Sequence, residues 1–183
     1  MTISQTDRKN IALLGEVLLR SHDPHRPVAA LIADASGKAV ADGTNAPPEP
    51  FRFSPDDTKT AIEADPKWKY FMLEHAERNA ILHATTSGIA LRGATMYGTL
   101  FPCADCARAI AASGIRRLVV PEPGIHPIRD EKWKDHYLYA REILDLSGVA
   151  VEHFPASDAS PVQEGVSEDE PGWLAEESRH SPG

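Results

Sequence analysis

The sequence predicts an α/β domain with three layers, in which a β-sheet lies between two layers of helices. After an early β-hairpin, the expected helices and strands alternate as far as residue 154, which is typical of strands joined by helical crossovers. A long helix before the last strand rules out a hairpin there and makes the last two strands parallel. The length of 183 residues and the hydrophobic content of 42% fit one domain around a single core.

The first elements are a helix and a hairpin. Apolar residues recur at helical spacing over 5–20, and Ser4 or Thr6 is available as the N-cap. The apolar stretch 28–33 is short enough for a buried strand. A turn signal of Asp, Ser and Gly follows it, so 38–43 is expected to be the returning strand.

A long connection follows the hairpin. Residues 45–66 are rich in Pro, Asp and Thr, and such a long connection inside a compact domain is usually functional or mobile. We expect a short helix over 58–64 within it. The connection contains neither Cys nor His, so no additional metal site is expected there.

The second half of the domain alternates regularly between helices and strands. Gly88, Gly114 and Gly148 mark the expected ends of its three helices. The last helix is expected to place five apolar side chains on or near one face: Trp133, Leu138, Ala140, Ile143 and Leu144. The predicted order is helix 74–85, strand 94–100, helix 103–113, strand 116–120, helix 131–146 and strand 149–154.

The composition divides the chain into a domain and a tail. We expect one catalytic domain over 1–154. Residues 155–183 are rich in Ser, Pro, Gly and Glu, a composition that predicts a solvated, flexible tail. Within that tail, Trp173 and Leu174 could dock on the domain or on a neighbouring subunit.

Charge and hydropathy exclude several classes of protein. No apolar run is long enough to span a membrane, and the N-terminus lacks the features of a secretory signal. Together with a content of only two cysteines, this predicts a cytoplasmic protein. The net charge of −8 and the lack of a dense basic block argue against a nucleic acid polymer as partner. A pocket for a single nucleotide phosphate is compatible with that charge.

Two short motifs carry the chemistry. His75 and Glu77 open one predicted helix, and Cys103 and Cys106 open another. Thiols three residues apart can lie on one face of a first helical turn, where the helix N-terminus favours thiolates. One histidine and two cysteines leave the fourth position of a tetrahedral zinc ion open, as a catalytic zinc site requires. Glu77 is therefore assigned a proton-shuttle role between water, a ring nitrogen and a departing amine.

The string His75-Ala76-Glu77 followed by Pro102-Cys103-Ala104-Asp105-Cys106 resembles the signature of the zinc-dependent cytidine and deoxycytidylate (dCMP) deaminase superfamily. The longer string 75–81 is most similar to the dCMP deaminase branch. The resemblance covers roughly 28–154. It implies a mixed five-stranded sheet between helices, a zinc site at two helix N-termini and a homo-oligomer. The parallel last strands inferred above agree with this branch and disagree with the branch that closes with a hairpin.

The resemblance also implies substrate contacts. It assigns Asn45, the backbone of Ala76 and Pro102 to substrate binding. The chain departs from the family pattern at two places: Ala46 follows the asparagine where glycine is common, and Pro121-Glu122-Pro123 stands where an aromatic residue commonly follows the fourth strand. These departures leave the expected hydrolytic deamination unchanged, and they bear on whether the substrate is a nucleotide.

The function predicted from these residues is hydrolytic removal of an exocyclic amine. The first substrate hypothesis is a pyrimidine nucleotide or nucleoside, especially dCMP. The alternative is a free nucleobase or another aminated heterocycle. A third hypothesis is a non-catalytic interaction module stabilised by zinc. The presence of Glu77 argues against it, because a purely structural zinc site does not require that carboxyl group. Editing of RNA or DNA, which shares the signature, is disfavoured by the acidic balance.

Several further residues are candidates for supporting roles. Asn79 either supports the site or serves the local structure. His126 and Trp133 follow the fourth predicted strand, near the strand ends where α/β proteins often bind ligands. For Trp133, the alternative to ligand binding is packing in the hydrophobic core. The candidates for holding a phosphate, each of which also fits a plain surface charge, are Arg52, Lys59, Lys67, Lys69 and Arg78.

Overall fold

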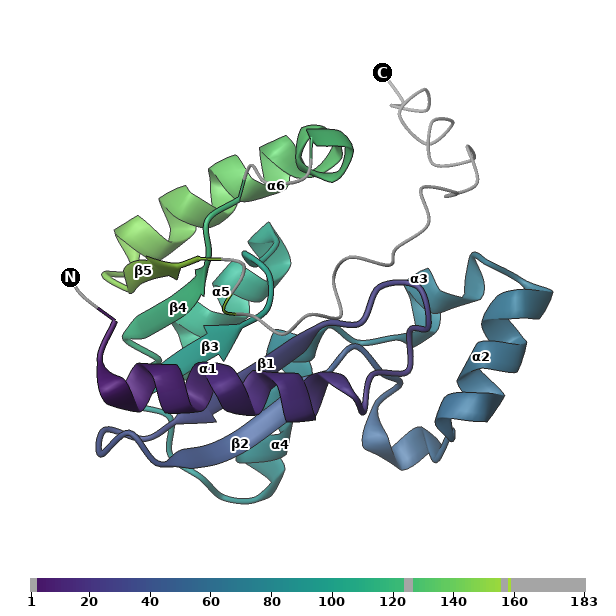
Figure 1. Ribbon diagram of the computed structural model, residues 1–183, viewed down its shortest axis with the longest axis horizontal. Coiled ribbons are helices and arrows are strands. Elements are labelled where there is room, and N and C mark those ends of the chain that lie inside the picture. Colours follow the sequence, from purple (N-terminus) through teal and green to yellow (C-terminus); the bar gives the residue numbers. More distant parts are fainter. Residues whose placement is uncertain (1–2, 124–126, 156–157, 159–183) are drawn as a thin grey trace.

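The computed structural model describes residues 3–123, 127–155 and 158, and Figure 1 shows one sheet with helices on both of its faces. This confirms the predicted three-layer α/β/α class. The elements are α1 (Gln5–Leu18), β1 (Ala29–Ala33), β2 (Ala39–Thr44), the 3-10 turn η1 (Glu49–Phe51), α2 (Pro55–Ala64), α3 (Trp68–Met72), α4 (Ala76–Thr86), β3 (Thr95–Gly98), α5 (Ala104–Ser113), β4 (Arg117–Pro121), α6 (Pro127–Leu146) and β5 (Ala150–Phe154).

The sheet is mixed and has five strands in the order β2-β1-β3-β4-β5. β1 pairs antiparallel with β2, as the predicted hairpin requires, and also with β3. β3, β4 and β5 are parallel to one another. The parallel last strands inferred from the length of α6 are therefore confirmed.

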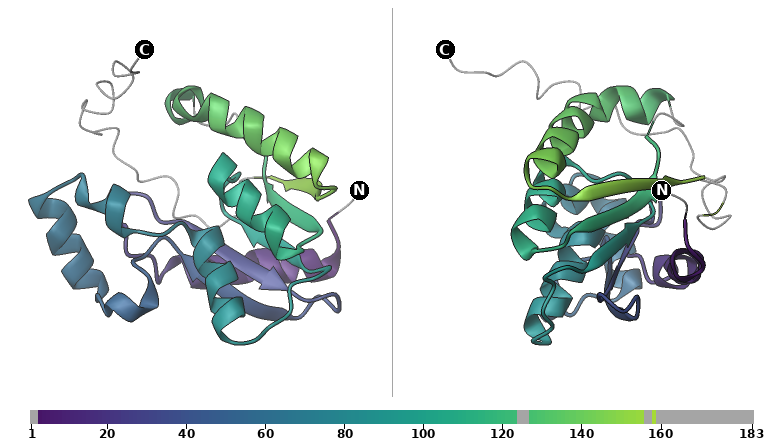
Figure 2. Two further views of the ribbon diagram at one scale, coloured as in Figure 1. Left: turned by 180° about the vertical axis from the view of Figure 1, so that it is seen from behind. Right: turned by 90° about the vertical axis from the view of Figure 1, so that its left-hand side faces the viewer.

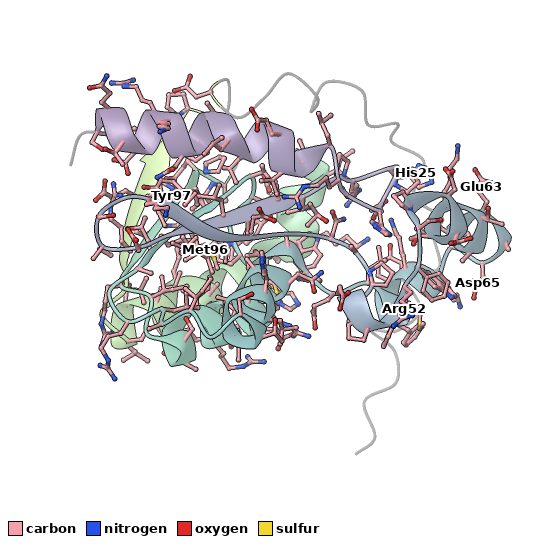
Figure 3. The ribbon with its side chains drawn as sticks, turned by 90° about the horizontal axis from the view of Figure 1, so that it is seen from below. His25, Arg52, Glu63, Asp65, Met96 and Tyr97 are labelled. Carbon is pink, nitrogen blue, oxygen red and sulfur yellow. The ribbon has the colours of Figure 1, made fainter. Side chains whose placement is uncertain are left out.

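The two faces of the sheet carry two separate apolar clusters. α1 covers one face, where Leu14 packs with Leu31 and Tyr97. α4, α5 and α6 cover the other face, where Ile32 and Met96 pack with residues of these helices (Figure 2). Adjacent residues of β3 therefore point in opposite directions, Tyr97 toward α1 and Met96 toward the opposite layer (Figure 3), as strand geometry requires.

The connection over 45–66 is more ordered than its composition indicates. α2 begins at Pro55, three residues before the predicted helix, because Ser54 and Asp57 form a reciprocal capping box and Pro55 occupies the first turn. The sequence carried this signal, and the prediction missed it. The turn η1 and the short helix α3 were not predicted either.

The last helix differs from its prediction at two points. α6 begins at Pro127 rather than at Glu131. Ala140 and Leu144 are fully buried as expected, whereas Leu138 is 61% exposed and does not belong to the buried face. With about 3.6 residues per turn, Leu138 lies off the stripe that contacts the core.

The close approach of β2 to α4 sets the position of the helix that carries His75. A Cβ atom on Gly43 would lie 2.4 Å from the Ala80 nitrogen and 2.6 Å from the Ala76 oxygen. Both are backbone atoms of α4, which cannot rotate away as a side chain can. Glycine is therefore required at this contact.

We expect Gly43→Ala to lower the free energy of unfolding by about 1–3 kcal/mol, the usual cost of overpacking, and to lower zinc content because α4 is displaced. Gly88→Ala is the control: its φ of +69° is strained for alanine, but nothing lies within 4 Å of the added atom. That variant should lose stability and keep its zinc. Urea unfolding and metal analysis measure both effects, and normal zinc content in Gly43→Ala would contradict the prediction.

No helix among the described residues is both long and apolar enough to cross a bilayer. Three predictions fall on residues outside the described ranges. These are the ligand role of His126, the docking of Trp173 and Leu174, and nearly all of the tail over 155–183. The extent of the catalytic domain, 1–154, stays a prediction.

Candidate active site

The two predicted motifs meet at the N-termini of two neighbouring helices. His75 is the N-cap residue of α4, and Cys103 is the N-cap residue of α5. Both have extended backbone, as N-cap residues commonly do. Cys106 lies in the first turn of α5, and its backbone N–H donates a hydrogen bond to the Cys103 Sγ at 3.5 Å. The local structure thus brings one imidazole and two thiols together.

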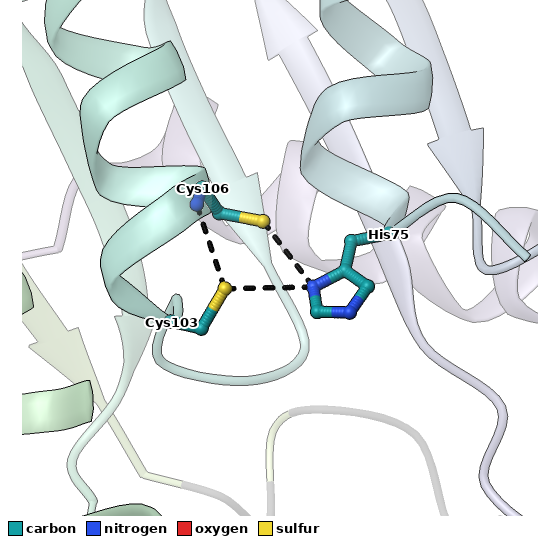
Figure 4. Close-up of side chains that lie close together, drawn as sticks. All are labelled: His75, Cys103 and Cys106. Atoms are coloured by element: carbon teal, nitrogen blue, oxygen red, sulfur yellow. Dashed lines mark hydrogen bonds between the residues drawn. The ribbon is translucent and has the colours of Figure 1, made fainter. Parts of the chain in front are cut away.

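The three side chains converge on one point (Figure 4). The Nδ1 atom of His75 is 3.5 Å from the Cys103 Sγ and 3.4 Å from the Cys106 Sγ. Zinc–sulfur bonds of about 2.3 Å and zinc–nitrogen bonds of about 2.0–2.1 Å in a tetrahedron place sulfur and nitrogen about 3.6 Å apart. The observed spacing therefore fits a zinc ion held by His75 through Nδ1 and by both cysteines, with a fourth position left open.

Glu77 lies directly beside this set of ligands. Its side chain is buried, with 6% of the residue exposed, and the Cys106 thiol donates to the Glu77 Oε2 at 3.5 Å. Burial raises the pKa of Glu77 above its usual value. A carboxyl group shifted in this direction is suited to taking and giving protons near neutral pH.

The three side chains that would hold zinc influence one another's pKa values. The hydrogen bond with Cys103 and, against the effect of burial, the nearby Glu77 raise the pKa of His75 to about 9. Hydrogen bonds from Cys106 and His75, again against burial, lower the pKa of Cys103 to about 4. The same contact with Cys103, together with burial, raises the pKa of Cys106. These shifts predict an imidazolium at His75, a thiolate at Cys103 and a thiol at Cys106 near pH 7.

This pattern predicts the proton balance of zinc binding. A zinc ligand must be a neutral imidazole or a thiolate, so at pH 7 His75 and Cys106 each give up a proton while Cys103 has none to lose. We expect about two protons to be released per zinc ion, and the logarithm of the affinity to rise by about two per pH unit near pH 7. Calorimetry in buffers of different ionisation enthalpy measures the number. Release of no protons would contradict the ligand set.

Contacts around α4 hold its first turn in place. Asn79 donates through Nδ2 to the carbonyl oxygens of Thr44 at 2.9 Å and Ala46 at 3.0 Å. Glu74 accepts the His75 backbone N–H at 2.9 Å and pairs with Arg78 at 2.6 Å. Of the two readings for Asn79, the contacts favour the structural one, since both of its bonds tie α4 to the end of β2.

A cavity of about 350 Å³ opens onto His75, Cys103 and Glu77. Its volume lies within the usual range for small-molecule sites. The wall combines aromatic rings with charged side chains from separate parts of the chain. The lining residues away from His75, Ala76, Glu77 and Cys103 are Asp23, Arg26, Val28, Asn45, Lys69, Tyr70, Leu73, Leu100, Phe101, Lys132, Trp133 and Tyr137.

Of the predicted substrate contacts, Asn45 and Ala76 line this cavity. The Asn45 side chain also has structural partners, because its Oδ1 accepts from the Val28 backbone N–H at 2.8 Å and its Nδ2 donates to the Arg26 carbonyl at 2.8 Å. One amide hydrogen remains for a ligand. Pro102 is buried directly in front of Cys103. The substrate-binding roles of these residues stay predictions.

The five candidates for holding a phosphate have different positions. Lys69 lines the cavity and lies 3.3 Å from the buried Asp23. Arg78 is paired with Glu74, and Lys59 lies 3.9 Å from Glu63. The remaining two, Arg52 and Lys67, do not belong to the lining of this cavity. Lys69 is therefore the member of the set that the fold brings to the site.

Sequence reasoning missed several lining residues. Phe101 directly precedes the predicted Pro102-Cys103 motif, so its position next to the site could have been inferred. Tyr137 stands four residues after Trp133, which places both on one face of α6. Arg26 and Lys132 carried no motif. Arg26 lies in the segment after α1 and Lys132 lies in α6, so both line the cavity only because the tertiary structure brings these two parts of the chain together.

The comparisons with known proteins agree with this geometry. Residues 4–122, more than half of the chain, match the family described as the cytidine and deoxycytidylate deaminase zinc-binding region. The deoxycytidylate deaminase of Enterobacteria phage T2 is 62% identical over 48 residues, 26% of this chain and 26% of that protein. The chain therefore matches only about a quarter of the length of this phage relative.

Two further comparisons cover more of the chain. Human deoxycytidylate deaminase is 30% identical over 135 residues, which is 74% of this chain and 71% of that protein. The crystal structure of dCMP deaminase from the cyanophage S-TIM5 in apo form superposes with a TM-score of 0.58, at 20% identity, over 82% of this chain and 99% of the other. The predicted cytidine-deaminase-like fold is thereby confirmed. The chain belongs to the cytidine and deoxycytidylate deaminase family, whose shared region binds zinc.

Proposed function

We propose that this protein is a zinc-dependent hydrolytic deaminase of a dCMP-type pyrimidine nucleotide. The observation that carries the proposal is the buried Glu77, which contacts Cys106 of the His75, Cys103 and Cys106 group and lines the adjacent cavity. A purely structural zinc site has no use for a buried carboxyl group beside an open coordination position. The relatives named above are deoxycytidylate deaminases, which supports the same reaction here.

The reaction exchanges the amine of the ring for the oxygen of water, so that dCMP and water give dUMP and ammonia. Bound zinc supplies the Lewis acidity that makes water nucleophilic near neutral pH. Glu77 takes a proton from the water and delivers it to the ring nitrogen beside the reacting carbon. The same carboxyl group then carries a second proton to the departing amine. The Ala76 backbone and the Asn45 amide hold the ring in place.

The charge of the cavity wall supports a phosphorylated substrate. Arg26, Lys69 and Lys132 come from three separate segments and line one cavity. Cationic side chains gathered in this way favour the phosphate group of a nucleotide. Lys69 in addition keeps its ammonium group close to the buried Asp23, which limits the charge that it offers.

That ion pair favours the second candidate function, deamination of a free nucleobase or another aminated heterocycle. Part of the positive charge at the cavity is already balanced by Asp23 at 3.3 Å from Lys69. An uncharged ring needs no additional cation. The two candidates share the zinc site and the role of Glu77, and they differ only in the phosphate.

Ammonia release from dCMP, deoxycytidine and cytosine distinguishes the two candidates. A nucleotide deaminase should prefer dCMP in kcat/KM, and Lys132→Met should reduce that preference about 10-fold or more, the usual effect of losing a hydrogen bond to a charged group. Lys59→Met, a change of an exposed lysine paired with Glu63, is the control. Preference for cytosine over dCMP would reject the nucleotide, and release from none of the three would reject the proposed function for this substrate class.

The assembly and location of the protein follow as further proposals. We propose a homo-oligomer, because large apolar side chains remain exposed on the described surface, among them Phe71 at 80% and Leu146 at 81%. Light scattering coupled to gel filtration measures the mass, and a monomer at micromolar concentration would contradict this. The cytoplasmic location expected from the sequence stays a prediction.

A further inference from the structure

The ring of Phe101 is enclosed by an ionic and aromatic cluster outside the zinc site. The Arg141 guanidinium carbon lies 4.8 Å from the centre of the ring, and the ring of Tyr137 meets it edge-on at 5.7 Å. The imidazole of His153 stacks on it at 6.3 Å with an interplanar angle of 29°. Glu122 pairs with Arg141 at 2.9 Å and with the His153 Nε2 at 2.9 Å. We call these five residues the Phe101 cluster.

The two ring nitrogens of His153 both face hydrogen-bond acceptors. Nδ1 lies 3.2 Å from the Val120 carbonyl oxygen, and Nε2 lies 2.9 Å from the carboxylate of Glu122. Neutral imidazole carries one N–H, whereas imidazolium carries two. Only the protonated ring can donate both bonds. When the ring loses one proton, the nitrogen that lost it becomes an acceptor and faces an acceptor oxygen, either the Val120 carbonyl or the Glu122 carboxylate.

Phe101 connects this cluster to the site. It is 6% exposed, lines the cavity and stands two residues before the zinc ligand Cys103. Its ring contacts His153 from β5, and Arg141 and Tyr137 from α6. Glu122, which directly follows β4, pairs with both Arg141 and His153. A change in the bonding of His153 therefore reaches the cavity wall through direct contacts.

We propose that His153, Glu122 and Arg141 are positioning residues that hold Phe101 against the bound substrate, and that protonation of His153 strengthens this hold. The proposal rests on the proposed function, since it concerns the same cavity. Among the described residues, Glu122 after β4 pairs directly with His153, while Arg141 and Tyr137 on α6 are connected to it through Glu122 and Phe101. The sign follows from the bonds: the wall is best ordered when both ring nitrogens of His153 donate, so substrate binding weakens as the pH rises and the ring loses its second N–H.

The first test measures KM and kcat from pH 5.5 to 8 for the wild type, His153→Gln and a matched control. We compare the factor by which KM rises between pH 5.5 and pH 8 in the two proteins. Glutamine does not titrate, so this factor should be roughly fivefold smaller in His153→Gln than in the wild type, which is the size expected for one hydrogen bond. kcat and zinc content should stay close to those of the wild type. His83→Gln, at an exposed histidine in the last turn of α4, should follow the wild-type profile. An unchanged profile in His153→Gln would overturn the proposal.

The second test is independent of turnover. In the zinc-loaded protein, the NMR signals of the Phe101 ring and of the His153 imidazole should titrate with a common midpoint. Glu122→Gln removes the negative charge that favours the imidazolium form, so it should lower the midpoint of the His153 titration. Because the Glu122 side chain is exposed, this substitution should not disturb folding. Phe101 signals that ignore the titration of His153 would overturn the proposal. If the wild type releases no ammonia, the proposed function fails while this titration still decides the positioning role.

Discussion

Glu77→Gln should lower kcat for deamination by about 10²- to 10⁴-fold, the usual contribution of a positioned acid–base group. Glutamine has the same shape but cannot accept the proton that Glu77 takes from water. The zinc content should not change, because the proposed zinc ligands are the His75 nitrogen and the sulfur atoms of Cys103 and Cys106. Steady-state kinetics together with metal analysis on the same preparation measure both quantities.

The matched control for this substitution is Glu16→Gln, at an exposed position of α1 on the opposite face of the sheet. It removes the same charge and should leave kcat at the wild-type value. Turnover within about threefold of the wild type in Glu77→Gln would remove the proton-shuttle role. Loss of zinc in that variant would instead make Glu77 part of the metal site.

Cys106→Ser should lower zinc affinity by at least about 100-fold, since even the loss of a residue that supports a ligand costs 10- to 100-fold. The Cys106 sulfur is buried and lies 3.4 Å from the His75 Nδ1, and a serine hydroxyl does not supply a thiolate at that point. Because zinc binds the folded chain, the stabilisation it provides should fall by about 2.7 kcal/mol for each 100-fold loss of affinity. Chelator competition and urea unfolding with and without zinc measure the two losses.

Ala109→Ser is the control for this substitution, because it places a serine at a half-buried position of the same helix, away from the ligands. It should bind zinc like the wild type. The chain has only two cysteines, so thiol labelling offers a separate check: a chelator should expose both thiols in the wild type. Wild-type zinc affinity in Cys106→Ser would remove that residue from the ligand set.

The parts of the fold that could be predicted are those with local signals. The spacing of Cys103 and Cys106 and the apolar periodicity of α4 and α5 are properties of short stretches, and they led to two facing helix N-termini. The length of α6 was sufficient to make β4 and β5 parallel. In the connection over 45–66, the capping box of Ser54 and Asp57 was also a local signal, but the abundance of Pro and Asp concealed it.

The cavity wall could not be predicted in the same way, because its members meet only through tertiary structure. Arg26 and Lys132 lie more than a hundred residues apart in the sequence, and neither belongs to a motif. The pairing of Lys69 with Asp23 likewise depends on how α3 packs on the segment after α1. The requirement for glycine at position 43 follows from a contact between β2 and α4 that no local pattern encodes.

Hydrolytic deamination at this site is tested most directly by a single reaction of zinc-loaded protein with dCMP in water labelled with ¹⁸O. We expect one ¹⁸O atom in the dUMP formed and one equivalent of ammonia; a chelator should abolish both, and Glu77→Gln should slow their formation by about 10²- to 10⁴-fold. Product without the label, or product formed equally well by Glu77→Gln, would contradict hydrolytic deamination at this site.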